Sequence, residues 1–306
     1  MSRERFVGLA CAGLSVLLFA SFTLVSRLGF ASRLHLVDLA ALRFGIGGVL
    51  LFPALLRVDL RRVGWRHAAA LALFGGVGFA LLAYAGFSLA PASHGAVLLH
   101  GTLPLWTYVF LRATGSSEPV GRRSLGVLLI AGGVALMVSD SLAIASTRQL
   151  VGDGLLLTAS LFWSAYGVLS RRLGLPATSG AAIVAGLSLC AFLPVYALLP
   201  DKRLLSVGPR ELVLQAVVQG VLIGAVSILV YTRAVASLGP ATTTVFAAAV
   251  PVLTTLAAIP LLSEIPGRAA LAGVGVVTTG MLVAGRMRDG PAPSPSALVL
   301  DGSPRR

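Results

Sequence analysis

The sequence predicts an all-α integral membrane protein with ten transmembrane helices, arranged as two inverted five-helix repeats. Three observations lead to this prediction. Of the 306 residues, 57% are hydrophobic and only 11% are charged, whereas a soluble domain carries roughly 25% charged residues. Apolar runs long enough to cross a bilayer recur along nearly the whole chain. Finally, the first five runs resemble the second five in order and spacing.

Each apolar run is predicted to be one membrane-spanning helix, because about 20 apolar residues cross a hydrocarbon core of about 30 Å. The runs cover residues 6–30, 36–56, 68–90, 92–111, 124–139, 152–173, 179–199, 212–237, 241–262 and 269–284. They are continuous and lack the period-2 alternation of barrel strands, so helices are favoured. The chain also holds 35 glycines, and clusters such as Gly45, Gly47 and Gly48 predict surfaces where helices pack closely.

The net charge of +13 follows the expected membrane topology and does not predict a nucleic-acid partner. If the amino terminus is cytoplasmic, the inside segments hold 15 arginines and the outside segments hold 7 Lys and Arg residues. This positive-inside bias predicts a multi-pass protein of the cell inner (plasma) membrane with both termini in the cytoplasm. The expected partners are the lipid bilayer and a small-molecule substrate, with a homodimer as an open alternative.

The chain is predicted to contain two domains and a tail. Residues 6–139 form the first five-helix repeat, residues 150–286 form the second, and residues 287–306 form a disordered cytoplasmic tail rich in Pro and Ser. The basic start SRER precedes a long run followed by further spans, so we expect an uncleaved first helix. Cys11 and Cys190 fall inside predicted helices and suggest neither a disulfide framework nor a metal site.

Internal repetition is the most informative feature of the sequence. The opening helices of the two halves align with a shift of about 144, which places Phe19 over Trp163 and Ser26 over Ser170. Further along the shift becomes about 147, with matched pairs Tyr84 and Tyr231, Pro104 and Pro251, and Gly126 and Gly273. Because five helices is an odd number, the second half must enter the membrane from the opposite side. Inverted repeats of this kind allow a site near the midplane to open to either face, which favours transport.

Several short patterns add a family resemblance. They are LRF at 42–44, LFASF and LFWSAY in the opening helix of each half, the prolines in GTLPLW and AAVPVL, and LSE after the ninth helix. Through them, over about residues 6–286, the chain resembles the EamA-like family of the drug/metabolite transporter superfamily. The resemblance implies ten helices in two inverted repeats, a central cavity lined by the first four helices of each half, and export or uptake of small metabolites. Two histidines in SHGAVLLH and the acidic residue in GSSEPVGRR depart from the family pattern.

Aromatic and polar residues at helical spacing are candidates for the substrate pathway. Aromatic rings with polar edges suit an amphipathic metabolite, although the same residues could serve packing or an aromatic belt. His100 could relay a proton or could bond a neighbouring helix, and the prolines could free backbone carbonyls. The candidates for substrate binding or the pathway are Phe19, Arg43, Tyr84, His100, Thr107, Trp163, Tyr166, Gln219 and Tyr231, and the candidate helix-break prolines are Pro104 and Pro251. We predict no catalytic residue, no metal ligand and no cofactor.

Arg43 is the unusual residue of the predicted second helix. An arginine at the centre of a spanning helix costs roughly 2.5 to 3.5 kcal/mol on insertion scales, so some interaction must offset the cost. Arg43 lies about 10 Å deep at 1.5 Å per residue, and its side chain could snorkel to the headgroups. Alternatively it faces the cavity and attracts a substrate carboxylate. Asp38, five positions away, is off its face of the helix.

These features favour a secondary transporter of a small metabolite, such as an amino acid or a related amphipathic compound, with export favoured and with alternating access between the repeats. The chain has no G-x-x-x-x-G-K-[ST] loop, which disfavours ATP as the energy source. The alternative is an integral-membrane enzyme acting on a lipid-linked substrate. Such an enzyme needs clustered Asp, Glu, His or Cys, and here these residues are scattered.

Overall fold

The computed structural model describes residues 3–113, 121–143 and 146–285. The predicted tail at 287–306 and Glu118 of the GSSEPVGRR loop lie outside the described residues. Within the described ranges every regular element is a helix and no strand is present. The prediction of an all-α chain is confirmed for this part of the protein.

The helices of the first half follow the predicted runs closely. They are α1 (Arg3–Ala31), α2 (Leu36–Leu55), the short α3 (Leu60–Val63), α4 (Trp65–Gly75), α5 (Val77–Leu89), α6 (Ala92–His94), the π-helix η1 (Gly95–Gly101), α7 (Leu103–Ala113) and α8 (Gly121–Ala143). Several predicted single helices are therefore built from two or three consecutive helical pieces.

The second half has a similar order of elements. It consists of α9 (Thr147–Leu173), α10 (Ala177–Leu198), the 3₁₀-helix η2 (Leu204–Ser206), α11 (Pro209–Gln215), the π-helix η3 (Ala216–Val226), α12 (Ser227–Leu238), α13 (Pro240–Phe246), α14 (Ala249–Leu262) and α15 (Arg268–Gly285). In each half, a π-helix interrupts one of the third and fourth predicted spans, and a break between two α-helices interrupts the other.

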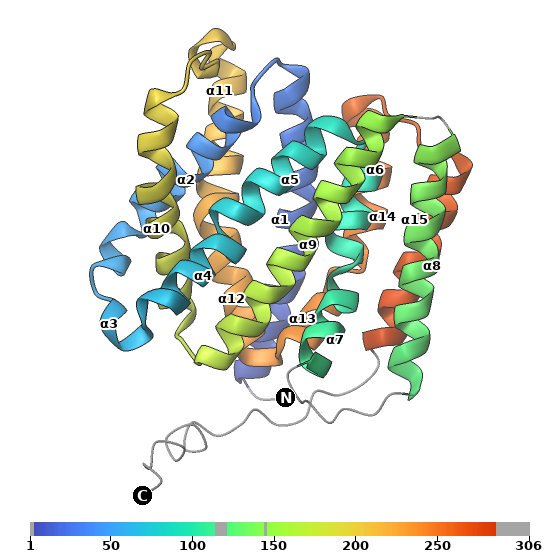
Figure 1. Ribbon diagram of the computed structural model, residues 1–306, viewed down its shortest axis with the longest axis horizontal. Helices are drawn as coiled ribbons and strands as arrows, with labels where there is room; N and C mark the ends of the chain where they lie inside the picture. Colours follow the sequence, from blue (N-terminus) through green and yellow to red (C-terminus); the bar gives the residue numbers. More distant parts are fainter. Residues whose placement is uncertain (1–2, 114–120, 144–145, 286–306) are drawn as a thin grey trace, which may run out of the picture.

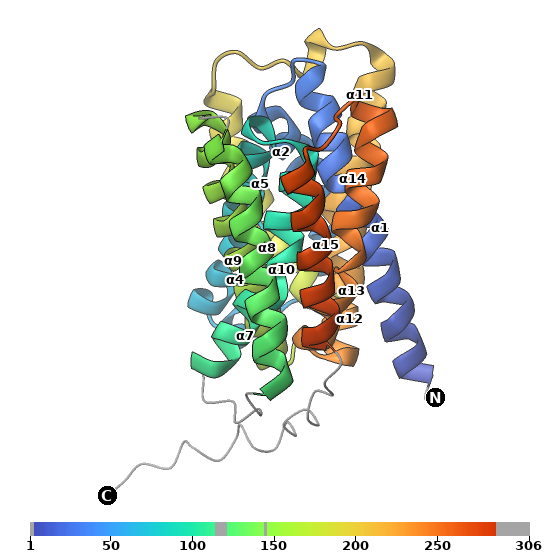
Figure 2. The same ribbon diagram turned by 90° about the vertical axis from the view of Figure 1, so that its right-hand side faces the viewer.

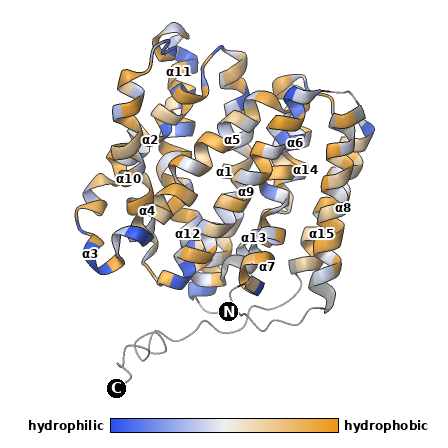
Figure 3. Ribbon diagram, in the orientation of Figure 1, coloured by the Kyte–Doolittle hydropathy of each residue, from blue (hydrophilic) through white to orange (hydrophobic). Residues whose placement is uncertain are grey.

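The distribution of hydropathy is that of a membrane protein. Hydrophilic residues gather at the two ends of the bundle, and the middle of the helices is mostly hydrophobic (Figure 3). Large apolar side chains such as Leu17, Leu128 and Leu256 are exposed on this middle zone, where lipid is the expected solvent. Five helical segments among the described residues are long and apolar enough to cross a membrane: Arg3–Ala31, Leu36–Leu55, Trp65–Leu89, Ala177–Leu198 and Pro209–Leu238. The chain is a multi-pass membrane protein, and the full number of ten spans stays a prediction.

Helices of the two halves interleave across the bundle. The α1 helix packs against α12 and α14, α2 packs against α10 and η3, and α5 packs against α9. The pair formed by α8 and α15 lies together at one side of the molecule (Figures 1 and 2). Each of these contacts joins a helix of the first half to one of the second, so the buried centre is shared by both halves.

Glycines set the closest of these helix crossings. A Cβ atom on Gly47 of α2 would lie 2.5 Å from the carbonyl carbon of Gly224 in η3. A Cβ on Gly126 of α8 would lie 2.7 Å from the carbonyl oxygen of Gly280 in α15. Only glycine permits backbones to meet at these distances, which is the packing that small residues provide in membranes. A Cβ on Gly45, from the same predicted cluster, would have no atom within 4 Å, so this glycine does not mark a crossing.

Breaks and π-turns interrupt four of the predicted spans near the bundle interior. The third span breaks at Gly76, where a Cβ would collide with the Ser188 hydroxyl. The fourth and eighth contain the π-helices η1 and η3, and the ninth breaks at residues 247–248. Such irregularities expose backbone groups and re-aim side chains, and they occur frequently at functional sites.

Candidate functional site

Aromatic side chains from both halves meet in the buried centre of the bundle. The ring of Phe19 on α1 stacks on His100 of η1 at a centroid distance of 5.0 Å. The same ring lies 5.9 Å from Trp163 on α9 and 5.8 Å from Tyr231 on α12. Four helices, two from each half, therefore converge at Phe19.

Trp163 extends this cluster toward two further residues. Its indole lies 4.9 Å from the Tyr231 ring, 5.2 Å from the Tyr166 ring and 4.5 Å from the Phe79 ring of α5. The Tyr166 hydroxyl is 2.6 Å from the Thr232 hydroxyl oxygen, so that phenol is already hydrogen-bonded. The Phe22 ring of α1 lies 6.1 Å from the Phe79 ring. We call Phe19, Phe22, Phe79, His100, Trp163, Tyr166 and Tyr231 the aromatic cluster. The sequence analysis proposed five of the seven as candidates; Phe22 belongs to its LFASF pattern without being named among the candidates, and Phe79 was not singled out.

Arg43 lies inside this cluster. Its side chain is only 2% exposed, and its guanidinium carbon lies 5.1 Å from the Phe22 ring centroid and 5.4 Å from the Phe79 ring centroid. Both contacts are cation–π interactions, which gain strength when the cation is desolvated. The alternative in which Arg43 snorkels to the headgroups is wrong, because the side chain points into the protein.

A chain of hydrogen bonds connects the surroundings of Arg43 to α1. The Tyr84 hydroxyl, next to the guanidinium, donates to Gln219 Oε1 at 2.9 Å. Gln219 Nε2 donates to Ser26 Oγ at 3.0 Å, and Ser26 Oγ donates to the carbonyl oxygen of Phe22 at 2.5 Å. The three side chains come from α5, η3 and α1 and are fully buried. Tyr84 and Gln219 thus join the two halves.

Several polar atoms at the cluster have no hydrogen-bond partner within the described part of the chain. They are Nε and Nη1 of Arg43, Nδ1 of His100, Nε1 of Trp163 and the hydroxyl of Tyr231. Buried polar groups are nearly always paired, and each exception in a folded protein requires an explanation. A bound polar molecule is one explanation that accounts for all of these atoms at once.

The remaining predicted residues lie along the fourth and ninth predicted spans. Pro104 is in the first turn of α7, directly after the π-helix, and Pro251 is in the first turn of α14, directly after the break at residues 247–248. Thr107 is buried on α7, and its hydroxyl has no hydrogen-bond partner among the described residues. No ring contact or hydrogen bond in the described ranges links Thr107 to the aromatic cluster.

Polar contacts also join helices at the ends of the bundle. Arg27, near the end of α1, binds Glu264 with Nε at 3.0 Å and Nη2 at 2.5 Å, and its Nη1 donates to the Phe87 carbonyl at 2.8 Å. Glu264 also accepts a bond from the Ala92 amide at 2.7 Å. Arg171, near the end of α9, donates to the carbonyls of Val235 and Ala236 at the end of α12.

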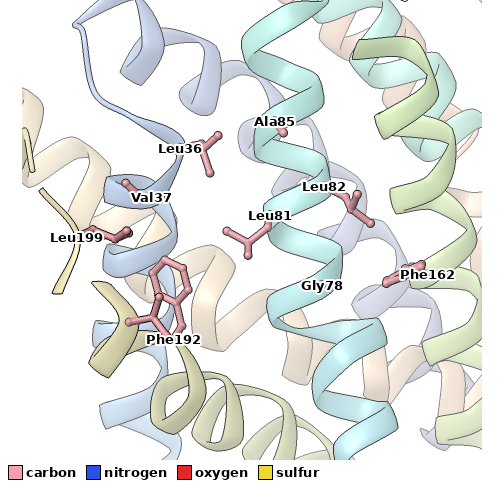
Figure 4. A pocket seen from close by; sticks show the side chains of 10 residues that line it. Leu36, Val37, Gly78, Leu81, Leu82, Ala85, Phe162, Phe192 and Leu199 are labelled. Atoms are coloured by element: carbon pink, nitrogen blue, oxygen red, sulfur yellow. The ribbon is translucent and has the colours of Figure 1, made fainter. Parts of the chain in front are cut away.

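An apolar groove of about 600 Å³ lies outside the cluster (Figure 4). It is lined by residues of α2, α5, α9 and α10, among them Leu36, Leu81, Phe162 and Phe192, and its lining is entirely apolar. A groove without polar groups cannot orient an amphipathic molecule. The aromatic cluster with Arg43, rather than this groove, is the candidate functional site.

Comparison with known proteins decides the family. The model of the EamA-like transporter family matches the chain twice, at residues 6–139 and 150–286. The chain belongs to the EamA-like transporter family. The resemblance recognised from LRF and the paired aromatic patterns is therefore confirmed. No functionally curated protein is similar to this EamA-like chain at a significant level.

Solved structures support the fold of this EamA-like protein. Seventeen structure chains match it significantly. One of them, described only as "Crystal structure of protein", has a TM-score of 0.64 and 22% sequence identity, and the match covers 92% of this chain and 97% of the other. At this identity the similarity concerns the fold alone. The family is one of transporters, and the substrate has to be argued from the site.

Proposed function

We propose that this EamA-like protein is a secondary transporter that exports a small amphipathic metabolite, such as an amino acid or a related compound. The observation that carries the proposal is the aromatic cluster, which both halves build and which holds unpaired polar atoms on His100, Trp163 and Tyr231. Ring faces bind the apolar part of such a compound, and the unpaired polar atoms bind its polar part.

Alternating access between two inverted repeats fits the arrangement of the helices. The α1 and α9 helices, which open the two halves, run in opposite directions through the bundle (Figure 1). Arg27 and Arg171 correspond in the repeat alignment, and each binds a carbonyl group at the end of the third span of its own half. The two arginines therefore support matched contacts at opposite ends of the bundle, as a two-sided transport cycle requires.

The membrane topology forms part of the same proposal. Residues 6–139 and 150–286 are the two inverted repeats, all ten helical spans cross the bilayer, and both termini face the cytoplasm of the plasma membrane. The excess of basic residues on the proposed inner side supports this orientation.

The competing enzyme function is disfavoured by how the buried acidic groups are used. Asp38 accepts hydrogen bonds from the Tyr196 hydroxyl at 2.8 Å and from two backbone amides, and Asp153 is 2.9 Å from His94 Nδ1. Within the described residues, no group of three or more His, Cys, Asp or Glu side chains is placed to hold a metal ion. A hydrolytic or metal-assisted reaction would need such groups to converge.

Counterflow in proteoliposomes tests the proposal. Protein is reconstituted with an unlabelled compound inside, and uptake of the same labelled compound is measured across a panel of amino acids, organic acids, nucleosides and organic cations. We expect exchange of at least one amphipathic compound, and a Phe19→Ala, Trp163→Ala double variant should lose it. An absence of exchange for the entire panel, from protein that elutes as a folded species, would contradict the transport proposal.

A further inference from the structure

Arg43 differs from the other Arg, Asp and Glu side chains that the structure buries or half-buries in the described part of the chain. Arg27 has Glu264, Asp153 has His94, and Asp38 has three hydrogen-bond donors. The Arg43 guanidinium has no carboxylate within ion-pair distance in the described part of the chain, and its Nε and Nη1 make no hydrogen bond. A buried cation without a counter-charge is costly to maintain, so this position favours the binding of an anion.

The rings around Arg43 hold the cation but leave its Nε and Nη1 donors unused. The Phe22 and Phe79 rings interact with the guanidinium through their π-electrons. Neither ring offers an oxygen or nitrogen that could accept a hydrogen bond. The arrangement therefore fixes the position of the guanidinium while these two donor atoms stay available.

The direction of the hydrogen-bond chain restricts what else can bind an anion here. The Phe22 carbonyl can only accept, so the Ser26 hydroxyl must donate its proton to it. Ser26 Oγ must then accept from Gln219 Nε2, which places Gln219 Oε1 toward the Tyr84 hydroxyl and requires Tyr84 to donate. Because the Tyr84 proton is used, an anion at this position would be held by Arg43 itself.

We propose that Arg43 binds the carboxylate of the transported compound, and that the adjacent faces of Phe79 and Trp163 bind its apolar part. This inference rests on the proposed transport function and names the substrate class as small organic acids or amino acids with a carboxylate beside an apolar group. The Phe79 and Trp163 rings lie 4.5 Å apart, and the Phe79 ring covers the guanidinium, so a ligand reaches Arg43 when the surrounding helices separate.

The charge of the site favours a carboxylate over a phosphate ester. Arg43 is the single Lys or Arg side chain among the buried residues that the structure describes. One positive charge neutralises one carboxylate, whereas a phosphate monoester carries about −1.5 to −2 charges at neutral pH and would stay partly uncompensated.

Thermal unfolding of the purified protein in detergent tests this inference with three simple probes at equal ionic strength. Sodium benzoate presents a carboxylate on a ring, benzamide is its neutral analogue, and phenyl phosphate carries the larger charge. We expect benzoate to raise the Tm of the wild-type protein, with benzamide giving little or no shift and phenyl phosphate a smaller shift than benzoate. Equal shifts from benzoate and benzamide, a larger shift from phenyl phosphate, or no shift from benzoate would overturn the inference.

Variants then locate the effect. Arg43→Gln should weaken the apparent affinity for benzoate at least about tenfold, and Arg43→Lys should retain part of it because the charge remains. Arg233→Gln is the matched control, since the Arg233 side chain is 45% exposed at the bundle end, and it should bind benzoate as the wild type does. An unchanged benzoate response in Arg43→Gln would assign the binding to another residue. If Arg43→Gln does not fold, the three-probe comparison on the wild type and on Arg43→Lys decides.

The counterflow assay separates failure of this inference from failure of the transport function. Equal exchange of a compound lacking a carboxylate by the wild type and by Arg43→Gln would leave the protein a transporter and would overturn the role of Arg43. An absence of exchange for every compound would count against transport itself, whatever benzoate does to the Tm.

Discussion

At the scale of single residues, Gln219 connects the two halves of the bundle through one side-chain amide. It accepts from Tyr84 in the first half and donates to Ser26, also in the first half, while itself belonging to η3 of the second half. Its amide thus satisfies two buried hydroxyl groups at once. The sequence indicated only a polar residue in an apolar run, because hydrogen-bond partners 135 and 193 positions away leave no local signal.

Replacing Gln219 with leucine should therefore destabilise the protein by about 1–3 kcal/mol, because the Tyr84 and Ser26 groups would lose their partner in a dry environment. The measurement is chemical or thermal unfolding in a fixed detergent. Combining Gln219→Leu with Tyr84→Phe should cost less than the sum of the two single changes, since the second removes a group left unpaired by the first. Strict additivity would contradict the bond between them.

Arg43 and its neighbours show how far sequence reasoning reaches at this scale. The sequence identified Arg43 because a cation inside an apolar run stands out. It identified Trp163, Tyr166 and Tyr231 because aromatic residues occupy matching positions in the two repeats. Phe79 was not identified, although its ring contacts both Arg43 and Trp163, because a phenylalanine in a membrane helix is unremarkable by composition. Its importance arises only from the crossing of α5 with α9.

At the scale of helices, the approximate span positions were predictable and the irregularities were not. Apolar runs fix where the chain enters and leaves lipid, so the predicted ranges correspond to helices or to groups of consecutive helices. The π-helices η1 and η3 lie inside continuous apolar runs, where hydropathy has no feature that marks them. Both π-helices pack against helices distant in the sequence, and the hydropathy pattern carries no information about such contacts.

The crossing of α2 with η3 gives a test at this scale. Gly47→Ala would place a methyl group within 2.5 Å of the Gly224 backbone, and we expect a loss of about 1–3 kcal/mol from the forced separation of the helices. Gly45→Ala, two positions earlier in the same helix and with open space around it, should be neutral or should stabilise by up to about 1 kcal/mol. Unfolding curves of the two variants in the same detergent compare them directly, and equal shifts would argue against a backbone contact at Gly47.

At the scale of the whole molecule, the Arg27–Glu264 ion pair fastens the first half to the connection between α14 and α15. Both side chains are 23% exposed, and Glu264 also accepts the Ala92 amide, so this contact is better ordered than a surface pair. We infer that it holds this end of the bundle closed. The sequence showed LSE at this position only as a family pattern and gave no sign of its partner 237 residues away.

Glu264→Gln should therefore increase access to the centre from the end of the bundle that carries Glu264. The assay uses a variant without Cys11 and Cys190, with one cysteine in place of His100, and measures labelling by a membrane-impermeant maleimide. A loss of about 1 kcal/mol from the closed state would raise the labelling rate roughly fivefold. Glu4→Gln is the control, because Glu4 is 71% exposed and lies 3.9 Å from Arg233 at the other end. Equal labelling of all three proteins would contradict a closing role for Arg27 and Glu264.

The position of Trp163 has a practical consequence. The chain has only three tryptophans, and Trp65 is 62% exposed on the outside of the bundle, whereas Trp163 is 2% exposed and touches the rings of two tyrosines. Excitation energy passes from tyrosine to tryptophan over such short separations and falls steeply as they part. With Trp65 and Trp106 replaced by phenylalanine, the fluorescence of Trp163 alone would report changes in the separation of α9 and α12 within the second half.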